Sequence, residues 1–259
     1  MPLCFLALCL RVSVAKVLRA RIAAVTTDAS AIATNLKRLR ERIARAAGRA
    51  GRREEEITIV AVSKTFPPEA IRAAYQAGVR HFGESRVQEF EAKRPKVADL
   101  DVTWHFVGRL QSNKARRAAQ LFGRVDTVDS LSLARRLDAA AAAEGKRLPV
   151  LIEVRLGDEA TKGGIAEADL APLAKGVVAL PQLELLGLTV IPPYFEDLEK
   201  VRPYFRKLRE LRDTLSSQLE WPLPVLSMGM SHDFEVAIEE GATEIRIGTA
   251  LFGEREARD

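Results

Sequence analysis

Residues 57–65 read Ile-Thr-Ile-Val-Ala-Val-Ser-Lys-Thr, a run of strand-forming and small apolar residues with a lysine near its end. The pair Pro67–Pro68 follows closely, and proline cannot continue the hydrogen bonding of a central strand. The run is therefore expected to form a buried strand that stops at Lys64. A lysine in that place suits three roles: a Schiff base, a phosphate contact, or a side chain that snorkels to water.

The same pattern of a short apolar run followed by a helical pattern recurs along the chain. Strands are expected at 57–64, 79–83, 104–108, 125–128, 150–156, 183–191, 224–228 and 244–248. Each is followed by an expected helix, at 67–77, 84–93, 112–121, 130–144, 166–179, 196–217, 231–240 and from 251. A further helix is expected from Asp28, with apolar residues at helical spacing up to Ile43.

Eight strands that alternate with helices predict right-handed crossovers and a parallel sheet. At this length the fold class is α/β, a single (β/α)8 barrel. An open doubly wound sheet is the alternative, but it usually carries a glycine-rich first turn. No Gly-x-Gly-x-x-Gly pattern follows the first expected strand.

The composition is that of a globular protein with a large core, with 47% hydrophobic and 29% charged residues among 259. Basic and acidic residues are interspersed, and aromatic residues make up only 6%, so nucleic acid is not an expected partner despite the net charge of +5. Cys4 and Cys9 are the two cysteines, too few for a disulfide framework. This usage fits a reducing compartment, and a cytoplasmic location is expected.

Residues 1–27 are expected to be an extension that precedes a single domain at 28–259. The apolar run Pro2–Leu10 is too short to span a bilayer, so no stable membrane association is expected. Its basic residues follow the apolar run, whereas a secretory signal carries them first. A transit peptide, a weak membrane-surface helix and a mis-assigned start codon remain open for this segment.

Two glycine-containing stretches follow the last two expected strands. They are Ser227-Met228-Gly229-Met230-Ser231, which is expected to lead directly into a helix, and Gly248-Thr249. Barrels frequently bind phosphate with the loops after strands seven and eight, where backbone N–H groups can approach an anion. Lys64 would lie across the barrel mouth from such a site. An amine facing a phosphate-bearing aldehyde is the arrangement that pyridoxal 5′-phosphate (PLP) needs.

Several motifs resemble one family, the YggS/PROSC pyridoxal phosphate homeostasis proteins. They are VSKT at 62–65, HFGESRVQE at 81–89, WHFVGRLQSNK at 104–114, SMGMS at 227–231, RIGT at 246–249 and FG at 252–253. The resemblance extends from about residue 32 to 255. The family is similar to the barrel domain of alanine racemase, the fold type III of PLP proteins, so the resemblance implies PLP as cofactor and a role in vitamin B6 homeostasis.

The resemblance also implies roles for individual residues. Lys64 would form the Schiff base, or internal aldimine. The other implied cofactor contacts are Ser227, Gly229, Gly248 and Thr249 at the phosphate, Met228 and Met230 beside the cofactor, Arg246 near its ring, and His105 and Ser85 at the mouth. A buried His105 can equally be a core histidine. Three positions depart from the family pattern, which commonly has Asn at Ser85, Met at Thr189 and Asn at Arg155.

Two functions compete. The first is a non-catalytic carrier that holds PLP and passes it transiently to PLP-dependent apoenzymes. The second is an amino-acid racemase, which in the alanine racemase pattern needs a tyrosine base from a second domain of another subunit. This chain ends at Asp259, directly after the eighth unit, so the carrier and a monomeric state are expected. A barrel that binds a phosphorylated metabolite without any cofactor is a third possibility.

Overall fold

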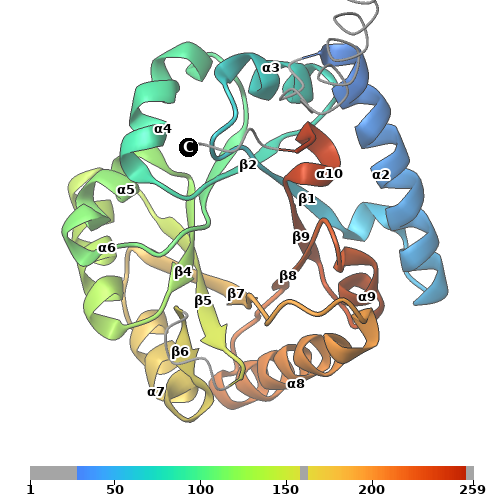
Figure 1. Ribbon diagram of the computed structural model, residues 1–259. Helices are drawn as coiled ribbons and strands as arrows, with labels where there is room; N and C mark the ends of the chain where they lie inside the picture. Colours follow the sequence, from blue (N-terminus) through green and yellow to red (C-terminus); the bar gives the residue numbers. More distant parts are fainter. Residues whose placement is uncertain (1–27, 158–162, 255–259) are drawn as a thin grey trace, which may run out of the picture.

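Eight parallel strands close into a barrel, as Figure 1 shows, which confirms the predicted fold class. The computed structural model describes residues 28–157 and 163–254, so the expected extension 1–27 lies outside the described residues. Neighbours along the chain pair in parallel, and the pairing of the first and last strands closes the ring. The barrel strands are β1 (Thr58–Val62), β2 (His81–Glu84), β3 (Thr103–Phe106), β4 (Arg124–Val128), β5 (Leu148–Arg155), β7 (Leu183–Thr189), β8 (Val225–Met230) and β9 (Glu244–Ile247).

Helices form an outer ring around these strands (Figure 1). They are α3 (Pro68–Gln76), α4 (Val87–Lys93), α5 (Ala115–Leu121), α6 (Leu131–Ala143), α7 (Glu167–Val178), α8 (Arg202–Leu219), α9 (Phe234–Glu239) and α10 (Thr249–Phe252). Their starts follow ordinary capping chemistry. Pro68 occupies the first position of α3, and Ser130 caps α6 by accepting a hydrogen bond from the Leu133 amide.

The helix expected from Asp28 is α2 (Ala29–Arg49), which lies in the ring between α3 and α9, with α10 on its inner side (Figure 1). The Asp28 side chain caps it by accepting a hydrogen bond from the Ser30 amide at 2.9 Å. The apolar stripe from Ile32 to Ile43 is buried against α3, α9 and α10. The helix therefore covers the seam where β1 meets β9.

Several element boundaries differ from the expected ones. β1 ends at Val62, so Lys64 lies two residues beyond the strand. The expected helix 196–217 is divided into a 3-10 turn, Leu198–Lys200, and α8. A two-residue strand, β6 (Ile165–Ala166), pairs with β5 and was not expected.

The loop after β8 also differs. Met228 and Gly229 belong to β8, and α9 begins only at Phe234. A turn at residues 231–233 intervenes, because the Asp233 carboxylate accepts a hydrogen bond from the Met230 amide at 2.6 Å. At the end of the described chain α10 stops at Phe252, and Gly253 has a φ of 85°.

The strands separate two interiors. Outward-facing side chains such as Phe82, Phe106 and Met228 are buried beneath the helices. Inward-facing positions carry charged and polar side chains, among them Arg124, Glu244 and Arg246. Burying charge is costly unless it is paired, so these residues are expected to contact one another. None of the helices in the described part of the chain has the length and apolarity to cross a bilayer.

Candidate functional site

A pocket of about 300 Å³ opens at the carboxyl ends of the strands. Its lining residues are Lys64, Ser85, Val107, Gly108, Arg109, Glu153, Val154, Arg155, Leu156, Gly157, Gly163, Ile191 and Pro193. They come from the ends of β1, β2, β3, β5 and β7 and the loops that follow. The structure therefore brings together two of the predicted site residues, Lys64 and Ser85, at the end of the barrel where α/β barrels carry their active sites.

The backbone around Lys64 has an unusual conformation. Thr65 has a φ of 70°, and the only other non-glycine residue of the described segments with positive φ is Glu220. Ser63, on the other side of Lys64, is fully buried. Lys64 itself is partly buried and lines the pocket. Among the described lining residues it supplies the only lysine amine, and a primary amine is what condensation with an aldehyde requires.

Glu153 is a pocket residue that the sequence analysis missed. Its side chain is 7% exposed, and one carboxylate oxygen lies against Gly163, where an added Cβ would be 3.4 Å away. Burial raises the pKa of Glu153, while the charges of Arg246 and Arg109 lower it in part. A single acidic residue inside the apolar run 150–154 is the signal that could have identified it.

Arg246, expected near the cofactor ring, is buried and anchored on β7 and β8. Its Nη1 donates to the Thr189 hydroxyl at 2.8 Å and to the Ser227 hydroxyl at 2.9 Å. Its Nη2 donates to the backbone carbonyl of Val190, just after β7, at 2.7 Å. Burial lowers the pKa of Arg246, and nearby carboxylates oppose that shift. The Ser227 hydroxyl thus faces Arg246 inside the barrel, and its expected contact with a phosphate stays a prediction.

The loops after β8 and β9 meet at Ser231. Its Oγ accepts hydrogen bonds from the amides of Gly248 at 3.3 Å and Ala250 at 3.2 Å. These amides converge on one oxygen atom, as they would on an oxygen of an anion. Gly229 has a φ of 92°, and a Cβ there would lie 2.6 Å from the Ala237 Cβ. Only glycine lets β8 approach α9 this closely.

Comparison with known proteins identifies the family. The family model for the alanine racemase N-terminal domain matches residues 28–256. A pyridoxal phosphate homeostasis protein from Aquifex aeolicus is 52% identical over 223 residues, which span 85% of this chain and 96% of that protein. The chain belongs to the pyridoxal phosphate homeostasis protein family.

Solved structures place the family in a wider fold group. PipY of Synechococcus elongatus, solved with PLP bound, is 41% identical with a TM-score of 0.77, and the match covers 86% of this chain and all of PipY. Alanine racemase from Corynebacterium glutamicum is 17% identical with a TM-score of 0.68, covering 88% of this chain and 62% of the racemase. The second likeness shows the fold alone.

Two expected contacts of this family member lie away from the pocket. Met228 is fully buried in the outer hydrophobic core, because it alternates with the inward-facing Ser227 on β8. His105 is also fully buried on β3, two residues before Val107, which lies just after the strand and lines the pocket. The expected place of Met228 beside the cofactor and of His105 at the mouth stays a prediction that this burial does not favour. Met230 is partly exposed at the end of β8.

His105 belongs to a cluster in the lower half of the barrel. Its Nδ1 lies 3.2 Å from the Asp126 carboxylate and its Nε2 lies 3.0 Å from Nδ1 of His81. His81 lines a hollow at the opposite, amino-terminal end of the barrel. Burial lowers the pKa of His81, and His105 lowers it further. Partners on both ring nitrogens of His105 are what the core-histidine alternative expects.

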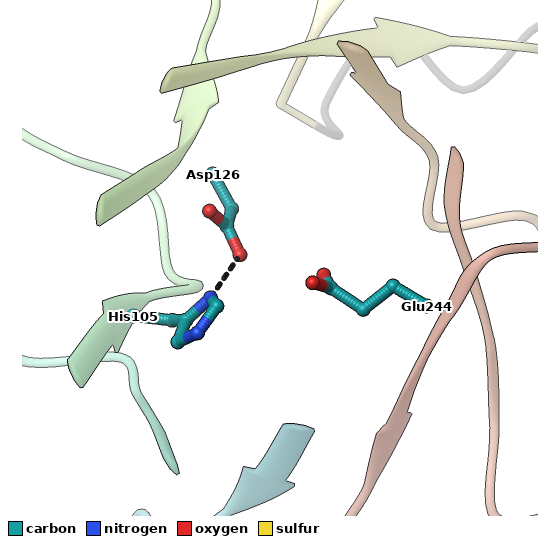
Figure 2. Close-up of side chains that lie close together, drawn as sticks. All are labelled: His105, Asp126 and Glu244. Atoms are coloured by element: carbon teal, nitrogen blue, oxygen red, sulfur yellow. Dashed lines mark hydrogen bonds and ion pairs between the residues drawn. The ribbon is translucent and has the colours of Figure 1, made fainter. Parts of the chain in front are cut away.

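Figure 2 shows His105, Asp126 and Glu244 converging inside the barrel, with ligand atoms within 4.8 Å of one another. Such a set can hold a metal ion, but Arg124 supplies the positive charge here. Its Nη2 lies 2.6 Å from the Glu244 carboxylate, and its Nε lies 2.6 Å from Asp126. Although burial raises the pKa of Asp126, Arg124 and His105 together hold it below its usual range. We assign this cluster to stability of the barrel.

Proposed function

We propose that this chain binds pyridoxal 5′-phosphate in the pocket at the barrel mouth and acts in intracellular PLP homeostasis. The observation that carries the proposal is Lys64, a primary amine that lines the pocket at the end of β1. The family names and the PLP-bound PipY structure support it. When bound, the cofactor supplies an aldehyde, which condenses with a primary amine and releases water.

The residues of the mouth fit such a ligand. Lys64 would hold it covalently, and Ser85 and Arg155 would line the space beside it. The amides of Gly248 and Ala250, which already converge on one oxygen atom, would serve the phosphate together with Gly229 and Thr249. Arg246 would place a cation near the ring. Its pKa is lowered by burial, but guanidinium stays charged at neutral pH.

We propose that the protein is a carrier without substantial catalysis. Racemisation of an amino acid on PLP needs a second base opposite the lysine. None of the three tyrosines of the chain lines the pocket, although Tyr194 lies near the mouth and is 73% exposed, stacked on His232. The racemase is the second candidate. It predicts rapid exchange of the Cα proton of L-alanine in deuterated water, and the carrier predicts none above background.

The remaining parts of the proposal concern partners and place. We propose a cytoplasmic monomer that passes PLP transiently to apoenzymes. Among the described residues only Ile191 and Tyr194 are large hydrophobic side chains with substantial exposure. Two such residues do not make an apolar patch of the size that stable homodimers bury.

The visible absorption spectrum tests the binding mode. Protein mixed with PLP should develop an absorption band at a longer wavelength than that of free PLP, and Lys64→Ala should abolish this band. Lys114→Ala is a matched control, because Lys114 lies at the rim of the barrel and lines a neighbouring hollow but not this pocket. It should keep the band. A band that survives Lys64→Ala would contradict the assignment.

A further inference from the structure

The segment that carries Lys64 needs an external anchor. Thr65 is β-branched and has a φ of 70°, a conformation that side chains branched at Cβ strongly disfavour. Such a conformation persists only where surrounding groups impose it. The direction in which Lys64 leaves the backbone therefore depends on what holds Ser63 and Thr65.

One partly buried ammonium group is linked to both of these neighbours, directly to Ser63 and through Glu89 to Thr65. Lys93 Nζ, on α4, donates to the Ser63 carbonyl at 3.0 Å. The same Nζ lies 2.8 Å from the Glu89 carboxylate, and that carboxylate accepts a hydrogen bond from the Thr65 amide at 2.5 Å. Lys93 thus ties α4 directly to the residue before Lys64 and, through Glu89, to the residue after it.

Glu84 completes the cluster from the end of β2. Its Oε1 accepts from Lys93 Nζ at 3.0 Å and from the Ser63 hydroxyl at 2.8 Å. Glu84 is fully buried, and the Lys93 side chain is 11% exposed. Glu84 Oε2 and Thr65 Oγ1 are buried and have no hydrogen-bond partner among the described residues. Burial raises the pKa of Glu84, while the Lys93 charge lowers it.

A cluster of this kind is a poor source of stability, because desolvation of buried charges can exceed their attraction. The position of the cluster beside Lys64 accounts for its presence better than its contribution to stability does. The backbone groups it contacts, the Ser63 carbonyl and the Thr65 amide, lie on either side of Lys64. The cluster itself lies behind the strand end, and none of its three charged residues lines the pocket.

We propose that Lys93, acting through Glu89 and Glu84, is a positioning residue for Lys64. It holds residues 63–65 in the one backbone conformation that directs the Lys64 amine into the pocket. An amine that is held in line with an aldehyde reacts faster than one on a mobile segment, because the orientation is already established. This inference rests on the proposed function of Lys64 and adds the residues that orient it.

The test is the rate at which apoprotein attaches PLP, followed by stopped-flow absorbance in the visible. Lys93→Met keeps the length of the side chain and removes its charge. We expect it to lower the second-order rate constant by about tenfold or more. Arg209→Met is the control, since Arg209 on α8 donates to the Glu240 carbonyl at 3.0 Å and contacts nothing near Lys64. It should lower stability while leaving the attachment rate within about twofold of wild type.

A rescue experiment separates positioning from general loosening. Glycine adopts positive φ without steric cost, so Thr65→Gly in the Lys93→Met background should recover part of the lost rate. Glu220→Gly relieves the other positive φ, 49° at the end of α8, and should recover none. If Lys93→Met does not fold, Glu89→Gln, which weakens the Thr65 contact, is tested in its place with the same expected direction.

The outcomes are distinct. A folded Lys93→Met protein, or Glu89→Gln in its absence, that attaches PLP within about twofold of the wild-type rate overturns the positioning role while leaving Lys64 as the attachment site. Wild-type protein that attaches no PLP at Lys64 overturns the proposed function, and the positioning role with it. A slowed variant that Thr65→Gly partly restores, beside unchanged controls, supports the inference.

Discussion

Arg124 at the start of β4 donates from Nη2 to both carboxylate oxygens of Glu244 at the start of β9, each at 2.6 Å. The two strands lie on opposite sides of the barrel, so this pair joins them through its interior (Figure 1). Asp126 shares the same guanidinium, with Nε 2.6 Å away. The stability of this part of the barrel interior therefore depends on one cation, Arg124, held between two carboxylates.

Removal of the Arg124 charge should lower the stability of the protein. Arg124→Met leaves Glu244 buried without its cation and Asp126 with His105 alone, which should lower the free energy of unfolding by about 3–5 kcal/mol. Urea denaturation measures it. Arg72→Met is the matched control, because it breaks an exposed pair with Asp99 and should cost under about 1 kcal/mol. Equal losses in the two variants would show that the interior cluster has no special role.

Gly229 should be intolerant of a side chain for two separable reasons. An alanine there meets both the positive φ of 92° and the Ala237 Cβ at 2.6 Å. Gly145→Ala is the control, since Gly145 has a φ of 64° with nothing within 4 Å of an added Cβ. For the control we expect the free energy of unfolding to fall by about 1–2 kcal/mol, from the backbone conformation alone. Gly229→Ala should cost about 1–3 kcal/mol more, and should also weaken PLP binding in equilibrium dialysis. Similar losses would indicate that the close approach to α9 is relaxed at little cost.

Thr189 should contribute stability through Arg246. Its hydroxyl accepts from Arg246 Nη1 at 2.8 Å and donates to the Ser227 carbonyl at 2.9 Å. Thr189→Val keeps the shape and removes both bonds, so we expect a loss of about 1–3 kcal/mol in the free energy of unfolding. Thermal or urea denaturation would measure the change. A variant as stable as wild type would show that the Ser227 and Val190 groups satisfy Arg246 on their own.

Glu153 should give stability a defined pH dependence. Burial raises the pKa of its carboxyl above 4.5, so the folded protein holds this proton more tightly than the unfolded chain does. Its contribution to stability is therefore greatest at low pH and is lost as pH rises from about 4.5 through the raised pKa. Glu153→Gln has no carboxyl at this position, so its stability does not fall with pH for this reason.

The measurement is urea denaturation of both proteins across that pH range. The free energy of unfolding of Glu153→Gln minus that of wild type should become more positive as pH rises. Asp129 and Arg109, whose charges also act on Glu153, are present in both proteins, so the two proteins differ only at position 153. A difference that is constant with pH would mean that Glu153 is not perturbed.

The sequence predicted the barrel because apolar runs, prolines and glycines mark its units clearly. The run from Ile57 to Val62 and the breaks at Pro67 and Gly78 are local signals that tertiary contacts did not override. Lys64 at the pocket followed from the rule that barrel sites lie at the carboxyl ends of strands. The barrel units and the position of Lys64 can therefore be predicted from the local sequence pattern and the fold class alone.

The direction of side chains could not be predicted in the same way. Met228 and Ser227 face opposite sides of β8, and only strand register decides which one faces the barrel interior. His105 likewise points inward but stops below the mouth, where His81 and Asp126 engage it. The anchor formed by Lys93 depends on how α4 packs behind β1, a long-range contact that spacing along the chain does not reveal.

The most direct measurement of the central claim is the identity of the residue that carries PLP. Wild-type protein mixed with PLP is reduced with borohydride, digested, and the peptides are weighed by mass spectrometry. We predict one equivalent of the reduced adduct, on the peptide that contains Lys64, and none in Lys64→Ala. An adduct carried mainly by another lysine, or no adduct above the level of an unrelated protein, would contradict the claim that this barrel holds PLP on Lys64.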